Sequence, residues 1–466
     1  MKLNYKKTIC VGFAFFLISM FWQAYDTLVP KILTDKFGMA QTWSGAIMAL
    51  DNLIALFLLP IFGAISDKTR TRFGRRTPYI VVGTVAAAVS FFALSFIDGW
   101  QKANLGELSA TLPAEERIAL AWEATAESPV TLVFFVLLLL VTLLSMAIFR
   151  SPAVALMPDV TVKPLRSKAN AIINLMGTAG GIIVLALGIV FGTGKAENVL
   201  MGYTPFIGVV VLLMLIALAA FLLTVREPKL VAEMEDESRR LGIDEEREAA
   251  EAKAKLAETK GVKLDRPHLI SLLLILASVA LWYIGYNAVI SKYSVYASGI
   301  LEMDYNTTLI IAQAAAVVAY IPAGIVATKL GRRKTILGGI VLLFCAFLFA
   351  AFLSKESSPL LLNTLFILAG IGWATINVNS FPMVVELSKS ADVGRYTGFY
   401  YTASMSAQIV TPVLSGILMD VIDMRVLFPY AAIFVALSFV TMFFVRHGDA
   451  KPAEGGSLLE QLGADD

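Results

Sequence analysis

The sequence predicts an all-α polytopic membrane protein: twelve transmembrane helices in two six-helix bundles. Its 466 residues are 58% hydrophobic and only 16% charged, with a mean hydropathy of +0.74, whereas a soluble chain carries about 25% charged residues. Apolar runs of about 20 residues, the length that crosses a bilayer, recur along most of the chain. One strongly charged segment, 226–266, separates six such runs from six more.

The apolar runs define the expected organisation. They cover 8–33, 42–65, 77–97, 130–157, 168–192, 203–225, 267–290, 305–328, 335–354, 358–386, 395–419 and 425–445. We therefore expect an N-terminal bundle at 1–225, a charged linker at 226–266, a C-terminal bundle at 267–445 and a tail at 446–466. The first run is too long for a cleavable signal and lacks a small-residue cleavage site. In the acidic loop 98–129, "AEERIALAWEA" predicts a short surface helix.

The distribution of positive charge predicts the orientation. With the N-terminus inside, the short inner segments hold 19 Lys and Arg residues and the outer segments hold eight. Cytoplasmic loops are enriched in these residues, so both termini should be cytoplasmic in a multi-pass protein of the cell (inner or plasma) membrane. The linker has ten basic and twelve acidic residues, and the net charge is +2, so nothing indicates nucleic-acid binding.

Several function classes find no support in the sequence. The two cysteines, Cys10 and Cys345, lie in predicted helices without metal-ligand spacing. We find no Walker motif, which argues against ATP-driven transport, and no pattern of a catalytic triad or metal cluster. We expect no enzyme activity, no cofactor and no metal.

A charged loop motif occurs once in each half. The first copy, "GAISDKTRTRFGRRTP" at 63–78, follows the second apolar run, and "GIVATKLGRRKT" at 324–335 follows the eighth. Matching loops after matching runs indicate an internal repeat. The simplest role of so many positive charges is to anchor the orientation. The motif residues that we single out are Gly63, Asp67, Gly74, Arg75, Arg76, Gly331, Arg332 and Arg333.

The duplicated motif resembles the major facilitator superfamily. The longer first copy, "SDKTRTRFGRRTPYI", and the stretch "RSPAVALMPDVTVKPLRSKAN" at 150–170 are similar to its glycoside/sugar:cation symporter branch, with its melibiose-type and sucrose-type carriers. The resemblance implies a transporter that works by alternating access. It also implies that the loop is a conformational latch, in which Arg75 and Arg76 pair across the interface between the halves. The anchor and latch roles are compatible.

Three charged residues lie well inside predicted helices, away from the ends, where an unpaired charge is costly. Asp26 and Asp51 have similar predicted depths on consecutive antiparallel helices, and Arg150 lies about two turns from the inner end of the fourth. Apolar surroundings and a second carboxylate both favour a neutral carboxyl group, so the pair could exchange a proton. Structural pairing of Asp51, substrate binding by Asp26 and snorkelling of Arg150 remain alternatives.

The coupling ion should be H⁺ rather than Na⁺. Melibiose-type carriers bind Na⁺ through two aspartates one turn apart in the second helix. Alignment on Pro60 and Gly63 puts Ala55 and Leu59 at those places, while Asp51 stands one turn earlier beside Asn52. This helix therefore lacks the pair of carboxylates that binds Na⁺ in melibiose-type carriers.

Polar and aromatic stripes on several predicted helices suit a sugar, because amides and carboxylates bind hydroxyls and aromatic rings cover C–H faces. Packing between helices, or an aromatic belt at the membrane surface, is the alternative for each stripe. The candidate substrate-binding residues are Trp22, Gln23, Asp26, Asn52, Asn174, Tyr286, Asn287, Trp373, Asn377, Tyr400 and Gln408.

These features together predict a proton-coupled symporter for a sugar, with an α-glucoside-like oligosaccharide suggested by the resemblance. The alternative is a proton-driven antiporter that exports sugars, drugs or other organic solutes. A sensor with the same fold but without transport ranks below both. The expected partners are the small-molecule substrate and the lipid bilayer, and we expect a monomer.

Overall fold

The computed structural model is all-helical in the part of the chain that it describes, residues 3–241, 266–387 and 393–448. Twelve helices are long and apolar enough to span a membrane, which confirms the predicted fold class. The first six are α1 (Tyr5–Lys31, continued by the π-helix Ile32–Lys36), α2 (Gln41–Lys68), α3 (Thr77–Asn104), α5 (Val130–Asp159), α6 (Arg166–Phe191) and α7 (Thr204–Thr224). The others are α10 (Arg266–Tyr296, continued by the π-helix Ala297–Leu301), α11 (Tyr305–Leu330), α12 (Arg332–Ala350), α13 (Pro359–Glu386), α14 (Val393–Val421) and α15 (Leu427–Phe443).

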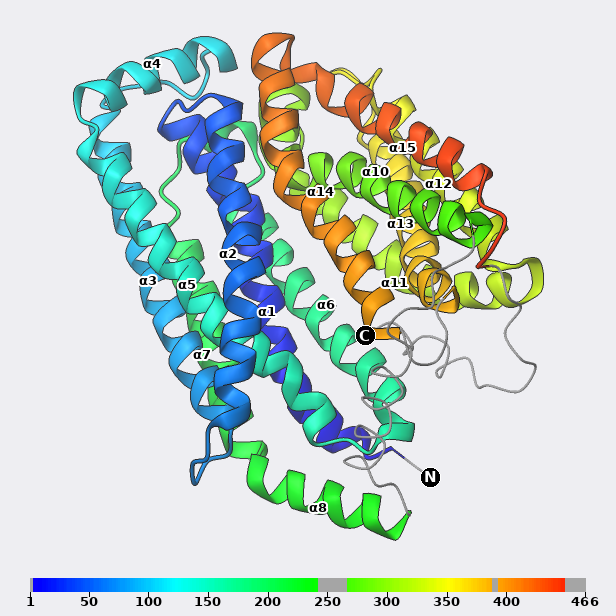
Figure 1. Cartoon of the computed structure of the whole chain (residues 1–466). Coiled ribbons are helices and arrows are strands. Elements are labelled where there is room, and N and C mark those ends of the chain that lie inside the picture. The colour runs from blue at the N-terminus through cyan, green and yellow to red at the C-terminus, as the bar shows by residue number, and fades with distance from the viewer. Residues whose placement is uncertain (1–2, 242–265, 388–392, 449–466) are drawn as a thin grey trace.

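The spans pack as two bundles side by side (Figure 1). Buried apolar side chains form two separate cores, one between Val11 and Val225 and the other between Leu272 and Val445. Each bundle is therefore held together mainly by its own side chains. Residues 242–265 of the expected linker, and the tail from residue 449, lie outside the described residues.

Two further helices mark opposite ends of the molecule. The helix α4 (Ala114–Glu127) is the surface helix expected from the loop sequence, and α8 (Glu227–Arg240) begins the charged linker. Figure 1 shows α4 at one end of the bundles and α8 at the other. We call these the α4 end and the α8 end.

The first span is longer than its apolar run indicates. The helix continues past residue 33 to Lys36, and Lys31, Asp35 and Lys36 near its end are buried. Lys36 pairs with Asp98 of α3, and the Lys31 ammonium lies 3.5 Å from Asp35. Partners from other elements make this burial tolerable, and hydropathy alone cannot detect them.

Hydrogen bonds between the bundles cluster toward the α4 end. Asp420 of α14 accepts from the backbone nitrogens of Gln41 and Thr42, at 2.7 Å each, and thereby caps α2. The buried Lys292 of α10 donates to the Gln41 carbonyl at 2.8 Å, and Lys31 donates to Ser298 at 2.6 Å.

Close backbone packing reinforces the closure at this end. A Cβ at Gly45 of α2 would overlap the carbonyl of Pro412 in α14, and one at Gly416 would overlap the carbonyl of Gln41. Glycine is needed where two helices approach so closely. Toward the α8 end, a groove of about 500 Å³ lies between α2 and α14, lined among others by Gly63, Ser151 and Met405.

The Asp420 cap yields a first prediction. Because a hydrogen bond to a charged group contributes about 1.5–3 kcal/mol, Asp420→Ala should raise the fraction of molecules open at the α4 end by about tenfold or more. Ser294, buried on the same stripe of α10 as Ser298, becomes a reporter as Ser294→Cys in a background lacking Cys10 and Cys345. Its rate of maleimide labelling measures the opening.

The matched control is Asp423→Ala, because Asp423 accepts from Arg425 within its own turn. Equal labelling rates in the two variants would show that the Asp420 cap does not hold the α4 end closed.

Candidate functional site

A cavity of about 470 Å³ lies between the two bundles. Its walls come from α1, α5 and α6 on one side and from α10, α11, α12 and α13 on the other. Six of the predicted residues line this large lobe: Trp22, Gln23, Asp26, Arg150, Tyr286 and Trp373. A site with walls from both bundles can be exposed to either end if the bundles rock against each other.

A smaller lobe of about 180 Å³ adjoins the first and holds most of the charge. It adds Asp51, Asn52, Asn287 and Gln408 from the predicted set. Trp22, Asp26 and Arg150 line both lobes. The three charged residues predicted within the spans therefore meet in one place, although they come from α1, α2 and α5.

Arg150 faces the cavity rather than a membrane surface. Its guanidinium carbon lies 5.4 Å from the centroid of the Trp22 ring, within range of a cation–π contact. It interacts electrostatically with Asp51 and Asp26, yet no ion pair within 4.0 Å joins it to a described residue. The snorkelling alternative does not fit this position, whereas a counter-charge shared by two carboxylates does.

The neighbours of Asp51 are few. Its carboxylate accepts from the side-chain amide of Asn52 at 2.8 Å. Ala55, one turn further along α2, is buried, and Leu59 lines the groove toward the α8 end. Among the described residues, no group of three or more His, Cys, Asp or Glu side chains could hold a metal ion.

Aromatic rings form one wall of the large lobe. Tyr286 and Trp373 stack with centroids 3.7 Å apart and planes 2° from parallel, and Tyr283 meets Trp373 edge-on at 5.2 Å. The rings thus pack against one another, and such aromatic pairs contribute about 0.5–1.5 kcal/mol each beyond the area that they bury. Near them, the indole nitrogen of Trp22 and the amide nitrogen of Asn287 are buried donors without a hydrogen-bond partner among the described residues.

Three predicted substrate-binding residues do not line either lobe in this structure. Asn174 is exposed and donates to Asn170 at 3.2 Å. The Tyr400 hydroxyl lies 2.9 Å from the Ser380 hydroxyl, and its ring packs on Phe381. Asn377 is half-buried one turn beyond Trp373 on α13. Helical spacing identifies a polar stripe, but it does not show which residues of the stripe reach the cavity.

The cavity also contains polar residues outside the predicted set. Gln313 and Tyr320 of α11 line the large lobe, together with Ser19 and Thr178. Gln313 donates to the side-chain oxygen of Gln23 at 2.6 Å and so connects the bundles. The sequence could have indicated Gln313 in one way, because it is the single amide in the apolar stretch "LIIAQAAAVVAYIP".

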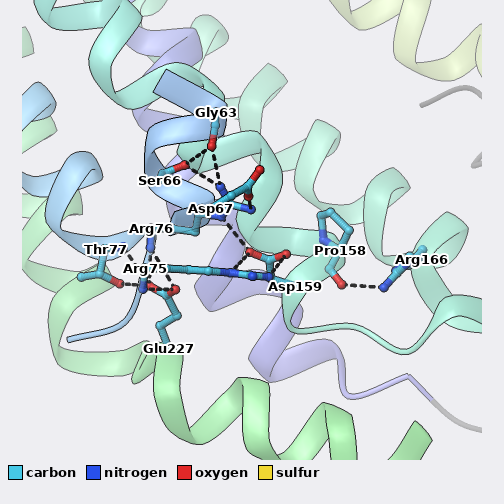
Figure 2. A network of polar contacts seen from close by, with 10 residues as sticks. All are labelled: Gly63, Ser66, Asp67, Arg75, Arg76, Thr77, Pro158, Asp159, Arg166 and Glu227. Atoms are coloured by element: carbon cyan, nitrogen blue, oxygen red, sulfur yellow. Dashed lines mark hydrogen bonds and ion pairs between the residues drawn. The ribbon is translucent and has the colours of Figure 1, made fainter. Parts of the chain in front are cut away.

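The first charged loop forms a network within the N-terminal bundle (Figure 2). Arg75 binds Asp159 at 2.6 Å, Arg76 binds the same carboxylate at 2.8 Å, and Arg76 also pairs with Asp67. Burial opposes the charge of Arg76, but the hydrogen bonds and negative charge of Asp159 and Asp67 outweigh this and raise its pKa. Among the described residues, Arg75 and Arg76 do not pair across the halves as expected, because Asp159 at the end of α5 supplies the acceptor.

The inter-bundle helix α8 joins this network through Glu227. This buried carboxylate accepts from the backbone nitrogens of Arg75 at 2.7 Å and Thr77 at 2.8 Å, and from the Thr77 hydroxyl at 2.7 Å. It thus caps the start of α3, where an acceptor is favourable. Gly74 precedes this turn with φ of 109°, a conformation that suits glycine.

The second copy of the motif is also bound within its own bundle. Arg332 lies 2.9 Å from Glu386 of α13. Arg333 donates to the carbonyl of Phe443 in α15, and Gly331 has φ of 91°. Each motif thus ties a loop to its own half in this conformation.

The family of the chain follows from a comparison with known sequences. A family model described as MFS/sugar transport protein matches residues 10–394. The chain belongs to this family. This is a family of membrane transporters rather than of enzymes, which confirms the resemblance of the repeated motif to the major facilitator superfamily.

Curated relatives match over short regions. An MFS-type transporter of Metarhizium majus is 30% identical over 25% of this chain and 25% of its own length. A sucrose transport protein of Arabidopsis thaliana is 33% identical over 14% of this chain and 13% of its own. The alignments thus span about a quarter or less of these relatives.

Solved structures match over nearly the whole chain. The xylose transporter XylE from E. coli, in an inward-open conformation, aligns with a TM-score of 0.63 at 13% identity and covers 99% of both chains. A D-xylose-proton symporter gives 0.60 at 16% identity, over 96% of this chain and 99% of its own. At such low identity the agreement shows the fold.

The loop network yields a second prediction. Arg75→Ala should lower the turnover of transport by about tenfold or more while the affinity for solute stays within about twofold, because the loop lies away from both cavity lobes. Rates and half-saturation constants of uptake in proteoliposomes measure this.

Arg72→Ala is the control, since this exposed arginine of the same loop contacts the ring of Phe73 instead of a carboxylate. A normal turnover number in Arg75→Ala would leave the loop with the role of an orientation anchor.

The aromatic wall yields a third prediction. Trp373→Ala should weaken solute binding by about five- to tenfold, because the stacked ring is removed from the cavity wall. Asn377→Ala should have a smaller effect, since Asn377 lies beyond the lining. Equilibrium binding to the purified protein compares them, and equal losses would place Asn377 in the site as the sequence predicted.

Proposed function

We propose that the chain is a proton-coupled symporter for a sugar, with an α-glucoside-like oligosaccharide as the substrate, working by alternating access. The observation that carries the proposal is one cavity between two bundles, with two carboxylates and an arginine in one lobe and stacked rings and amides in the other. Such a site can hold a neutral polar solute next to a group that takes up a proton.

The lining suits a sugar. Buried donors on Trp22 and Asn287 need acceptors, and hydroxyl groups accept hydrogen bonds. The combined size of the lobes, about 470 and 180 Å³, falls in the range of small-molecule sites. The match to the sugar transport family and the partial similarity to plant sucrose transporters support the same substrate class.

The charged lobe supports H⁺ as the coupling ion. Neutralising Asp51 or Asp26 with a proton would remove one of the two negative charges that act on Arg150 and would change the charge balance of the cavity. Na⁺ would need several oxygen ligands, and next to Asp51 the helix α2 offers Asn52 and then the apolar Ala55.

The charge distribution supports an orientation with the α8 end and both termini in the cytoplasm. The basic loop around Arg75 and Arg76 lies at the α8 end (Figure 2), as expected for a cytoplasmic loop. With this orientation the molecule is closed toward the outside, so the conformation is inward-facing.

The Asp51→Asn variant gives the fourth prediction. Asparagine mimics the protonated carboxyl group, so the variant should still bind sugar and exchange labelled for unlabelled sugar across the membrane. It should lose uphill accumulation driven by a pH gradient, because it cannot release a proton inside. Paired counterflow and pH-jump assays in proteoliposomes, over a panel of sugars with and without Na⁺, measure both activities.

Asp236→Asn is the matched control, since Asp236 is exposed on α8. Accumulation retained in Asp51→Asn would move the coupling role to Asp26, and loss of sugar binding would make Asp51 a substrate ligand. In the wild type, uptake driven by an outward proton gradient would indicate an antiporter, and binding without counterflow would indicate a sensor.

A further inference from the structure

We propose that Gln23 and Gln313 form a cross-bundle amide pair that binds a hydroxyl group of the sugar and selects substrates by it. The inference rests on the proposed function, because it assigns a specific contact in the same cavity. It concerns a residue, Gln313, that the charge and motif patterns of the sequence did not identify.

The pair lies where a solute can reach it. The Gln313 amide nitrogen of α11 donates to the Gln23 oxygen of α1 at 2.6 Å, and both side chains line the large lobe. On α6, Gly181 also lines this lobe, and a Cβ there would lie 3.4 Å from each of the two amide oxygens. Glycine at this position therefore leaves room next to both oxygens.

The pair keeps unused hydrogen-bonding capacity. A side-chain amide has two N–H donors and an oxygen that accepts twice. The bond between them uses one donor of Gln313 and part of the Gln23 oxygen. The side-chain nitrogen of Gln23 and the side-chain oxygen of Gln313 take no part in this bond, and they make no hydrogen bond with another residue in the part of the chain that the structure describes. A free donor and a free acceptor side by side suit a hydroxyl group, because a hydroxyl group can both donate and accept a hydrogen bond.

The pair also lies at the inner limit of the closed α4 end. Closer to that end on α11, Tyr305 and Asn306 donate to Thr193 at 3.0 and 3.1 Å. Gln313 lies seven residues further along the helix, about 10 Å at ~1.5 Å per residue. Among the cross-bundle hydrogen bonds of the described residues, this is the one in which both side chains line the large lobe.

This position links recognition to movement. Opening the α4 end separates α1 from α11, so the amide–amide bond must break. Without a new partner, the two separated amides would each lose a hydrogen bond. A sugar hydroxyl can then bind to them and replace the bond that they made to each other. A solute without a hydroxyl at that point leaves them unsatisfied, and a site built for such a group rejects the analogue that lacks it.

The test compares one disaccharide with its monodeoxy analogues. The probe is the tritiated disaccharide that the wild type accumulates best among maltose, sucrose, trehalose and melibiose, and each analogue competes in counterflow. We expect one deoxy position to bind about tenfold more weakly in the wild type. In Gln313→Met, which keeps the size but removes the amide, the parent sugar should lose about tenfold in affinity and that analogue should lose none.

Two further variants complete the design. Gln23→Met should also bind the parent sugar and the same deoxy analogue with similar affinity. This second variant keeps the test decisive if Gln313→Met folds poorly. Val318→Leu is the control on the same helix, since Val318 is 73% exposed, and it should discriminate as the wild type does. Unfolding temperatures verify that each variant is folded.

The outcomes separate this inference from the proposed function. An unchanged ratio of parent to analogue affinity in both methionine variants overturns the amide pair, and so does an equal loss for every sugar, which would make the pair a structural tie. Absence of disaccharide counterflow in the wild type overturns the proposed function, and this inference with it.

Discussion

The dominant constraint on this molecule is the free energy needed to keep charged side chains away from water. The chain accommodates such buried charges in two ways. Near the α4 end, Lys36 and Asp98 are fully buried and pair directly, so neither can change its charge cheaply. In the cavity, Asp26, Asp51 and Arg150 share a lobe without close ion pairs among the described residues. The first arrangement stabilises a bundle, and the second leaves charges that can respond to a proton or a solute.

The division into two cores determines what can move. The two large apolar cores lie one in each bundle, whereas the contacts between the bundles at the α4 end include the hydrogen bonds and glycine contacts described above. Hydrogen bonds exchange readily with water when an interface opens, because the net contribution of each is only about 1 kcal/mol, or about 1.5–3 kcal/mol where one group is charged. An apolar interface of the same size would resist opening. The polar closure around Asp420 and Lys292 is thus suited to repeated separation.

The sequence predicted the features that depend on local pattern. The twelve spans, the surface helix at 114–127 and the cavity positions of Trp22, Asp51 and Trp373 followed from hydropathy and helical spacing. Features that depend on distant partners were missed. The buried end of the first span needs Asp98, and the role of Gln313 needs Gln23. Asn174 and Tyr400 lie on polar stripes whose direction is set by the packing of whole helices.

The charged loops fit this division as well. Arg75 and Arg76 bind Asp159 of their own bundle, Glu227 fixes the same loop to α8, and Arg332 binds Glu386 in the other half. Closing the α8 end therefore need not break these bonds, since each network moves with its bundle. Closure would instead change the surroundings of the networks, because the two positively charged loops would approach each other and lose water. Their internal carboxylates reduce that repulsion, so a latch built on these loops depends on Asp159 and Glu386 as much as on the arginines.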